Sequence, residues 1–178
     1  LGLARRFGAP EIGVMEITEI PPDAEVVQSY LYWVMIAGFD DTVSINGDEF
    51  TGTWIGTTDD TCWGMGDNHV YRATVRSTVN QNGIYQVTGF DYVPSVIDNQ
   101  GFTIVVVYRI SSSTEITRVT ISDGGIYGGS GIAAVPSQAT WSEPIGSPVI
   151  RARVHFTVGD AQDAPDGPTR VNGVQIAQ

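Results

Sequence analysis

The chain has 178 residues, with 20 acidic side chains against 9 basic ones and a formal net charge of −11. Every basic residue is Arg, and because a face that binds nucleic acid needs clustered Lys and Arg, this composition argues against a nucleic-acid partner. Val, Ile and Thr together number 55, whereas Leu occurs only 3 times. β-Branched side chains lose χ1 freedom in helices but pack well in sheets, so we expect an all-β protein with a real core.

The first twenty residues are predicted to form an N-terminal arm or edge strand in front of a single β-sandwich domain, residues 21–178. Residues 11–20 alternate imperfectly and stop at Pro21-Pro22, which is typical of an edge strand. Such an arm can add a strand to a second copy of the chain, or it can pair within its own sandwich. The residues predicted to make the contact between subunits are Arg5, Arg6, Ile12, Val14, Ile17 and Ile20.

The strongest strand signal is the apolar segment 26–37, VVQSYLYWVMIA, which is predicted to be a central strand covered on both faces. Residues 42–46 and 49–54 flank Asn46-Gly47, and an Asn-Gly pair between two alternating segments predicts a β-hairpin. A loop rich in Gly, Thr and Asp is expected to follow over residues 56–68.

The second half of the chain continues as short strands between long loops. The apolar segment 102–110, FTIVVVYRI, is predicted to be a second central strand, so that the core centres on residues 30–36 and 102–108. Gly and Pro are dense over residues 123–148, which excludes a helix of normal length there. Further strands are expected at 69–79 (with at most one short helical turn at its end), 84–89, 115–122, 132–135 and 149–158, and a second Asn-Gly turn at 172–173. This pattern predicts an antiparallel, jelly-roll-like β-sandwich with long loops rich in Gly and Pro.

Four segments carry a resemblance to known families: YLYW (30–33), VSING (43–47), YRATV (71–75) and NGIYQVTG (82–89). In this order they resemble galactose-binding-like jelly rolls. The chain is also similar to uncharacterised β-sandwich modules of large bacterial and archaeal secreted surface proteins, which share YLYW, a CWG loop as at 62–64, and a GFTIVVVY-like segment followed by a DG turn.

The resemblance covers residues 24–176 and implies a β-sandwich, an extracellular location and a structural or adhesive role without a catalytic residue. Modules of this kind often continue past the last Asn-Gly hairpin, which implies a strand that a neighbouring subunit can supply. Because residue 1 is Leu rather than Met, we also expect a processed part of an exported protein. The longest apolar run, residues 104–108, is too short to span a bilayer, so no membrane insertion is expected.

No catalytic motif is apparent. His69 and His155 are the only side chains of a type that could serve as a base at neutral pH, and GxSxG, HExxH and paired-cysteine spacings do not occur. Surface histidines without chemistry are the simpler interpretation, so we predict a protein that is not an enzyme. Cys62 is the only cysteine, and it is either a half-buried thiol or a crosslink to a neighbouring subunit.

Calcium is the cofactor that the carboxylates favour. Asp160, Asp163 and Asp166 recur every three residues, and Ca²⁺ takes several oxygen ligands from flexible loops. Ordinary solvated turns are the alternative, since the spacing is not that of an EF-hand loop.

A carbohydrate site is predicted at the loop that Trp54 and Trp63 flank. An exposed indole beside Asp59, Asp60 and Asn68 would stack on a sugar ring and bond its hydroxyls. The alternative is that both tryptophans fill the ends of the core. We therefore expect a non-catalytic extracellular module that assembles with copies of itself by strand addition into a cell-surface filament or layer, and as a second possibility a glycan-binding, adhesive module.

Overall fold

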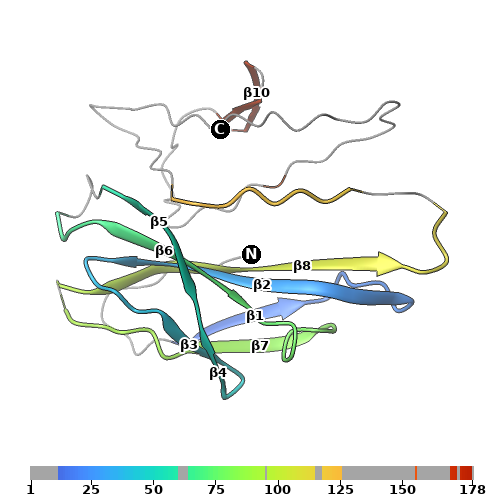
Figure 1. Ribbon diagram of the computed structural model, residues 1–178, viewed down its shortest axis with the longest axis horizontal. Helices are drawn as coiled ribbons and strands as arrows, with labels where there is room; N and C mark the ends of the chain where they lie inside the picture. The colour runs from blue at the N-terminus through green and yellow to red at the C-terminus, as the bar shows by residue number, and fades with distance from the viewer. Residues whose placement is uncertain are drawn as a thin grey trace.

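The computed structural model describes residues 12–59, 64–94, 96–114, 118–125, 155, 169–171 and 173–177. Within these residues the protein is all-β, without a helix, and every strand pair is antiparallel. Two four-stranded sheets lie one above the other, as Figure 1 shows. The predicted antiparallel β-sandwich is therefore confirmed, whereas its jelly-roll connectivity stays a prediction.

The strand order of each sheet determines which strands lie at the edges of the sandwich. The first sheet runs β1 (Gly13–Ile17), β7 (Gly83–Thr88), β3 (Thr42–Ile45), β4 (Asp48–Thr51). The second runs β5 (Thr53–Thr58), β6 (Asn68–Thr74), β2 (Ala24–Ile36), β8 (Asp98–Ile110). A separate two-stranded sheet consists of β9 (Thr169–Val171) and β10 (Val174–Ala177).

The core lies between the two four-stranded sheets. Successive residues of a strand point to opposite faces, so Leu31, Trp33 and Met35 of β2 are buried against the first sheet. The strand register aligns four aromatic side chains in one row across the second sheet, Trp54–Tyr71–Trp33–Phe102. The buried core consists of Met15, Leu31, Trp33, Met35, Val43, Ile45, Tyr71, Ala73, Val75, Val79, Tyr85, Val87, Phe90 and Phe102.

The prediction of a central strand is confirmed for β2 and is wrong for β8. β2 pairs with β6 on one side and with β8 on the other. Within the described residues β8 pairs with β2 alone, so it forms an edge of its sheet. Its inner side chains Phe102, Ile104 and Val106 pack on the core, but Tyr108 is exposed. An apolar run reports that both faces of a strand are covered, and it does not report that both edges are paired.

Both Asn-Gly turns close hairpins. Asn46 and Gly47 have φ values of 51° and 91°, the two positive values that a tight two-residue turn between β3 and β4 requires. Gly173, with φ 81°, lies between β9 and β10. One turn of backbone after β6, in which Val79 N–H donates to Val75 O at 2.8 Å, matches the single short helical turn expected there.

Two other segments that were expected to be strands have a different structure. The segment 49–54 is not one strand, because the chain leaves the first sheet after β4 and enters the second as β5. Gly52 makes this crossing directly over the Trp33 ring, where a Cβ would overlap Trp33 Cη2. In the predicted strand 115–122, the described residues 118–122 are not in a strand. Residue 155 is the described part of the expected strand 149–158, and residues 126–148, with the expected strand 132–135, lie outside the described residues.

The start of the described chain pairs within its own sandwich. β1 lies at the edge of the first sheet and pairs with β7, from Gly13↔Val87 to Ile17↔Gly83. Met15 points into the core, and Asn82 holds the end of the segment by donating to Ile20 O at 2.8 Å and accepting from Ile20 N–H at 2.9 Å. This is the second of the two arrangements considered for residues 11–20, while Arg5 and Arg6 lie outside the described residues.

Candidate functional site

Exposed aromatic side chains gather at one corner of the sandwich, where β5 forms the edge of the second sheet. Trp54 is 56% exposed and Phe39, in the turn after β2, is 72% exposed. Phe39 stacks on His69 of β6 with ring centroids 4.1 Å apart, and it meets Trp54 edge-on at 6.3 Å and 86°. We name Phe39, Trp54 and His69 the aromatic corner.

The rings of the aromatic corner are held in place by hydrogen bonds. Trp54 Nε1 donates to Gly56 O at 2.8 Å and to Thr57 Oγ1 at 3.1 Å. The same hydroxyl lies 3.1 Å from Nδ1 of the buried His69. The polar group of the indole is thus satisfied by its own strand, and the face of the ring is left as a preorganised surface.

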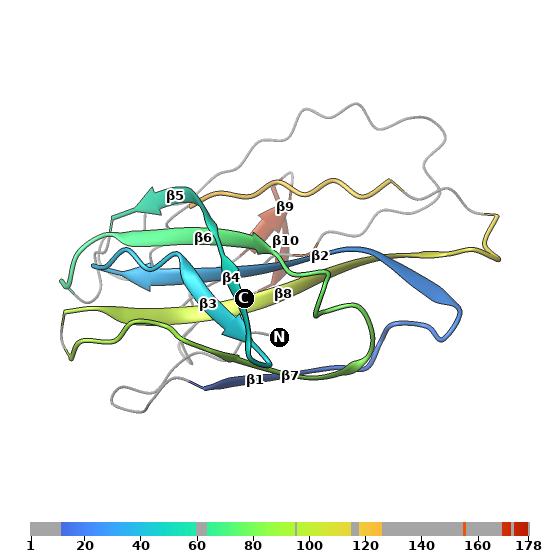
Figure 2. The same ribbon diagram turned by 60° about the horizontal axis from the view of Figure 1, so that its bottom comes forward.

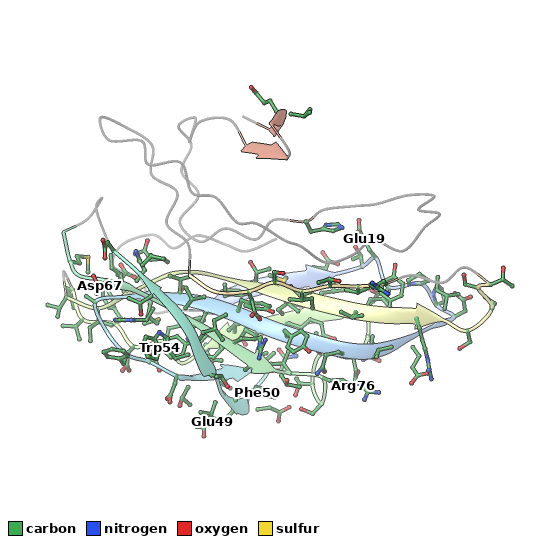
Figure 3. The ribbon with its side chains drawn as sticks, turned by 45° about the horizontal axis from the view of Figure 1, so that its top comes forward. Glu19, Glu49, Phe50, Trp54, Asp67 and Arg76 are labelled. Atoms are coloured by element: carbon green, nitrogen blue, oxygen red, sulfur yellow. The ribbon has the colours of Figure 1, made fainter. Side chains whose placement is uncertain are left out.

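The charge around the corner is negative. Burial lowers the pKa of His69, against a smaller opposing effect of the nearby Asp67 carboxylate, so the imidazole is neutral at neutral pH. Burial, with a further effect of Asp41 and Asp40, raises the pKa of Tyr71 beneath the corner. Asp41 and Asp67 are exposed, and Figure 3 shows Asp67 and Trp54 on the same half of the molecule. A ligand of this surface would meet aromatic faces and carboxylates.

The structure brings together part of the predicted carbohydrate site. Thr58 pairs with Asn68, so Asp59 follows directly after the last ladder pair, just past the end of the strand that carries Trp54. Trp54 does not fill the core, contrary to the alternative considered for it. Asp60, Trp63 and Cys62 lie outside the described residues, as do Asp160, Asp163 and Asp166 of the predicted calcium site.

Two residues of the corner were missed as ligand-binding candidates, Phe39 and His69. The one available signal for Phe39 was a large apolar side chain inside the polar turn GFDD. His69 was considered as a base, but its imidazole contacts a threonine hydroxyl and two aromatic rings. His155, the other histidine, is exposed.

No group of three or more His, Cys, Asp or Glu able to hold a metal ion occurs in the part of the chain that the structure describes. In the same residues, no helix has the length and apolar character needed to cross a membrane.

A second surface of interest is the side of the sandwich on which β1 and β8 are the terminal strands of the two sheets (Figure 2). The edges face each other closely, because a Cβ on Gly13 would overlap the Phe102 ring. Exposed apolar side chains continue from this side onto the outer face of the first sheet, namely Ile12, Val14 and Ile84. Exposed apolar residues grouped in this way mark contact surfaces more often than scattered ones do.

The outer face of the second sheet carries a polar anchor. Asp123 Oδ2 accepts from Tyr32 Oη at 2.9 Å and from Arg72 Nη1 at 2.6 Å. These bonds hold the segment 118–125 across β2 and β6, and Gly125 then packs against the backbone of Gly56. Tyr30, Tyr32 and Val34 on the outer face of β2 are only half-exposed, which agrees with the predicted cover on both faces for this part of the strand.

The anchor gives a pH-dependence prediction. Burial, followed by the hydrogen bond and charge of Asp123, raises the pKa of Tyr32 to about 12 from an ordinary value of 10.0. The folded chain therefore keeps the phenol proton longer than the unfolded chain, so the stabilising contribution of Tyr32 is complete below pH 10 and is lost as the pH rises toward 12. Titration of tyrosinate absorbance should show a late rise to which Tyr32 contributes one tyrosine; Tyr32→Phe should remove that contribution and leave the one from Tyr71, and Asp123→Asn should move it to lower pH. A native protein without such a contribution would contradict the assignment.

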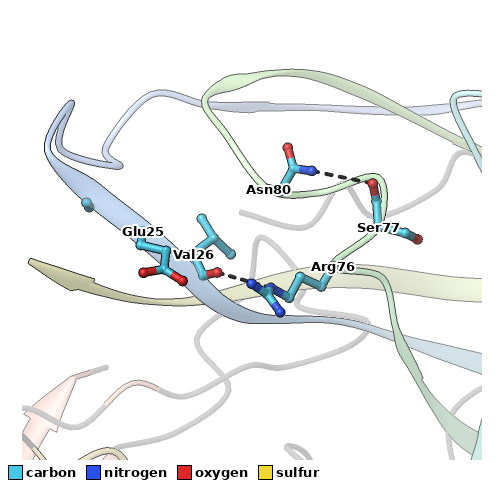
Figure 4. Close-up of a pocket in the computed structure, with 6 residues that line it drawn as sticks. Glu25, Val26, Arg76, Ser77 and Asn80 are labelled. Carbon is cyan, nitrogen blue, oxygen red and sulfur yellow. Dashed lines mark hydrogen bonds between the residues drawn. The ribbon is translucent and has the colours of Figure 1, made fainter.

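The surface hollow shown in Figure 4 is formed by β2 and the turn after β6. Its polar groups are already bonded within the chain, since Arg76 Nε donates to Val26 O at 3.1 Å and Asn80 Nδ2 to Ser77 O at 3.4 Å. Glu25, on its rim, pairs with Arg109 at 2.6 Å. This hollow therefore offers a ligand few unpaired groups and is a weaker candidate than the aromatic corner.

Comparisons of the chain with protein-family models, with curated proteins and with solved structures found no match. The resemblance to surface-protein modules therefore stays a prediction.

Proposed function

We propose that this chain is a non-catalytic structural module that assembles with copies of itself by strand addition, as a building block of an extracellular filament or layer. The observation that carries the proposal is the edge strand β8. It is 13 residues long, and residues 102–108 carry no charge. Among the described residues, no strand pairs with its outer edge. A long apolar edge strand presents a row of N–H and C=O groups that templates pairing with another chain.

The strand directions of the second sheet suit a repeating assembly. Neighbouring strands alternate in direction, so β5 at one edge runs antiparallel to β8 at the other. The β8 edge of one copy can therefore accept the β5 edge of the next as an antiparallel neighbour. Such a head-to-tail contact uses two different surfaces, and it generates an open filament when the rotation between copies does not close a ring.

A charge placed on the edge strand tests the proposal. Val107→Lys puts an ammonium group on β8, and Lys on an edge strand opposes strand addition. We expect the unchanged chain to sediment as species that grow with concentration and to form filaments or layers in electron micrographs, and the variant to remain monomeric. Val27→Lys is the matched control, because Val27 is exposed on the central strand β2 and should leave assembly unchanged.

Circular dichroism of the Lys variants establishes that both remain folded. The proposal fails if the unchanged chain is monomeric at every concentration, or if Val107→Lys assembles as the unchanged chain does.

A further inference from the structure

We infer that the aromatic corner of one copy is the binding site for the Arg5-Arg6 pair of the next copy; this inference rests on the assembly proposed above. The ligand class is a guanidinium side chain. The receiving residues are Phe39 and Trp54, together with the exposed carboxylates of Asp41, Asp59 and Asp67.

The chemistry of the corner favours a cation. Trp and Phe rings attract cations to their faces, and among cations the planar guanidinium also stacks on aromatic rings. Two such rings are exposed here at right angles, and the hydrogen bonds of Trp54 Nε1 fix the indole so that little freedom is lost on binding. Because His69 is neutral at neutral pH, it does not repel a positive ligand.

The charge balance of the chain favours an arginine ligand over an acidic or phosphorylated one. The net charge is −11, and the three exposed carboxylates beside the corner would repel an anion. All of the chain's cations are Arg, and two of them are adjacent at residues 5 and 6. The same contact already occurs within the fold, where the Arg72 guanidinium lies 5.5 Å from the centroid of the Tyr30 ring.

The register of the strands places the start of the described chain and the aromatic corner at opposite edges of one copy. Trp54 and Phe102 are the two ends of the aromatic row across the second sheet, and Gly13, at the start of β1, lies against Phe102. β1 and β5 are terminal strands of the two sheets, and Figure 2 shows them at opposite margins of the sandwich. A copy added at the β8 edge therefore brings its own Trp54 close to the point where the first copy's arm begins.

The length of the arm is sufficient for this contact. Five residues lie between Arg6 and Ile12, so the two are six residue steps apart, a distance of about 20 Å in an extended chain. Adjacent strands are only about 5 Å apart. The arm can thus pass the β8 edge and reach the corner of the added copy, so that the cationic contact and the strand contact join the same pair of copies.

The test uses a synthetic peptide of residues 1–11, LGLARRFGAPE, and the full chain carrying Arg5→Gln and Arg6→Gln, so that the chain's own arginines do not compete. We expect the peptide to bind and to change Trp fluorescence, to bind more weakly as salt rises, and to lose binding when its two arginines are replaced by Gln. Trp54→Ala or Phe39→Ala in the receiving chain should each weaken binding by about tenfold. Tyr108→Ala is the matched control, because Tyr108 is an exposed aromatic residue on β8 and should leave the affinity unchanged.

A second variant separates the effect of charge from the loss of packing that the alanine substitutions also cause. Asp41→Asn combined with Asp67→Asn keeps side-chain volume and should weaken binding through charge alone. Equal affinity of the peptide for the unchanged corner and for Trp54→Ala would overturn the inference. The inference would also be overturned if the chain failed to bind the peptide but bound neutral oligosaccharides, such as maltohexaose or chitotetraose, in a way that requires Trp54. The aromatic corner would then be a carbohydrate-binding site.

The two proposals can fail separately. If the peptide does not bind while the unchanged chain assembles and Val107→Lys does not, the assembly proposal stands and the arginine site is wrong. If the peptide binds at the corner but the unchanged chain remains monomeric, the arginine site is supported and strand-mediated assembly is wrong.

Discussion

Gly52→Ala is expected to lower the free energy of unfolding by about 3 kcal/mol, because the new methyl group would overpack the core. At this residue the chain crosses from β4 to β5 directly over the Trp33 indole. A Cβ here would overlap Trp33 Cη2 and lie 2.7 Å from Cζ2. The indole cannot move aside cheaply, since it is buried, stacks on Tyr71 at 5.4 Å and donates from Nε1 to Asp40 O at 3.0 Å.

Urea unfolding followed by Trp fluorescence measures this effect, and Gly83→Ala is the control. Gly83 is also at the end of a strand, as the first residue of β7, but a Cβ there would approach nothing closer than 3.9 Å, on the Tyr85 ring. The control should change stability by less than about 0.5 kcal/mol. Equal losses in the two variants would show that the cost comes from removing glycine in general and not from the contact with Trp33.

The features of the fold that the sequence predicted are those that local chemistry decides. The surplus of β-branched residues predicted the all-β class, and Asn46-Gly47 predicted its hairpin, because few other residue pairs adopt two positive φ values without strain. The cover on both faces of β2 also followed from its apolar run. These signals depend on backbone preference and burial, which neighbouring residues in the chain determine.

The features that the sequence did not predict depend on distant parts of the chain. The crossing at Gly52 depends on the Trp33 ring, which precedes it by 19 residues and comes from β2 of the second sheet. The edge position of β8 depends on where the chain places other strands, and pattern alone carries no such information. In the candidate site, Trp54, Asp59 and Asn68 were identified, but Phe39 was not, since its role arises only from stacking on His69.

The largest polar effect is expected at Asp40, which is only 9% exposed. Its Oδ2 accepts from Asp91 N–H at 2.6 Å and its Oδ1 from Thr42 N–H at 3.2 Å, so one carboxylate joins the turn between β2 and β3 to the chain that follows β7. Burial raises the pKa of Asp40, and the two backbone hydrogen bonds oppose that effect by stabilising the charged form. Its carboxylate is thus an acceptor for two backbone donors at a junction between the sheets.

Asp40→Ala should therefore lower the free energy of unfolding by about 2 to 4 kcal/mol, because it leaves two partly buried N–H groups without their acceptor. Asp41→Ala is the matched control: Asp41 is the exposed neighbour, and among the described residues its carboxylate accepts one solvent-exposed bond, from Thr42 Oγ1 at 3.2 Å, so little stability should be lost. Asp40→Asn should fall between the two, since its amide keeps one acceptor oxygen for two donors. Chemical unfolding of the three variants measures the order, and an Asp40→Ala loss no larger than that of Asp41→Ala would contradict the bridging role. Because Phe39 precedes Asp40 directly, the same carboxylate also fixes the turn that presents the Phe39 ring, which links the stability of this junction to the geometry of the aromatic corner.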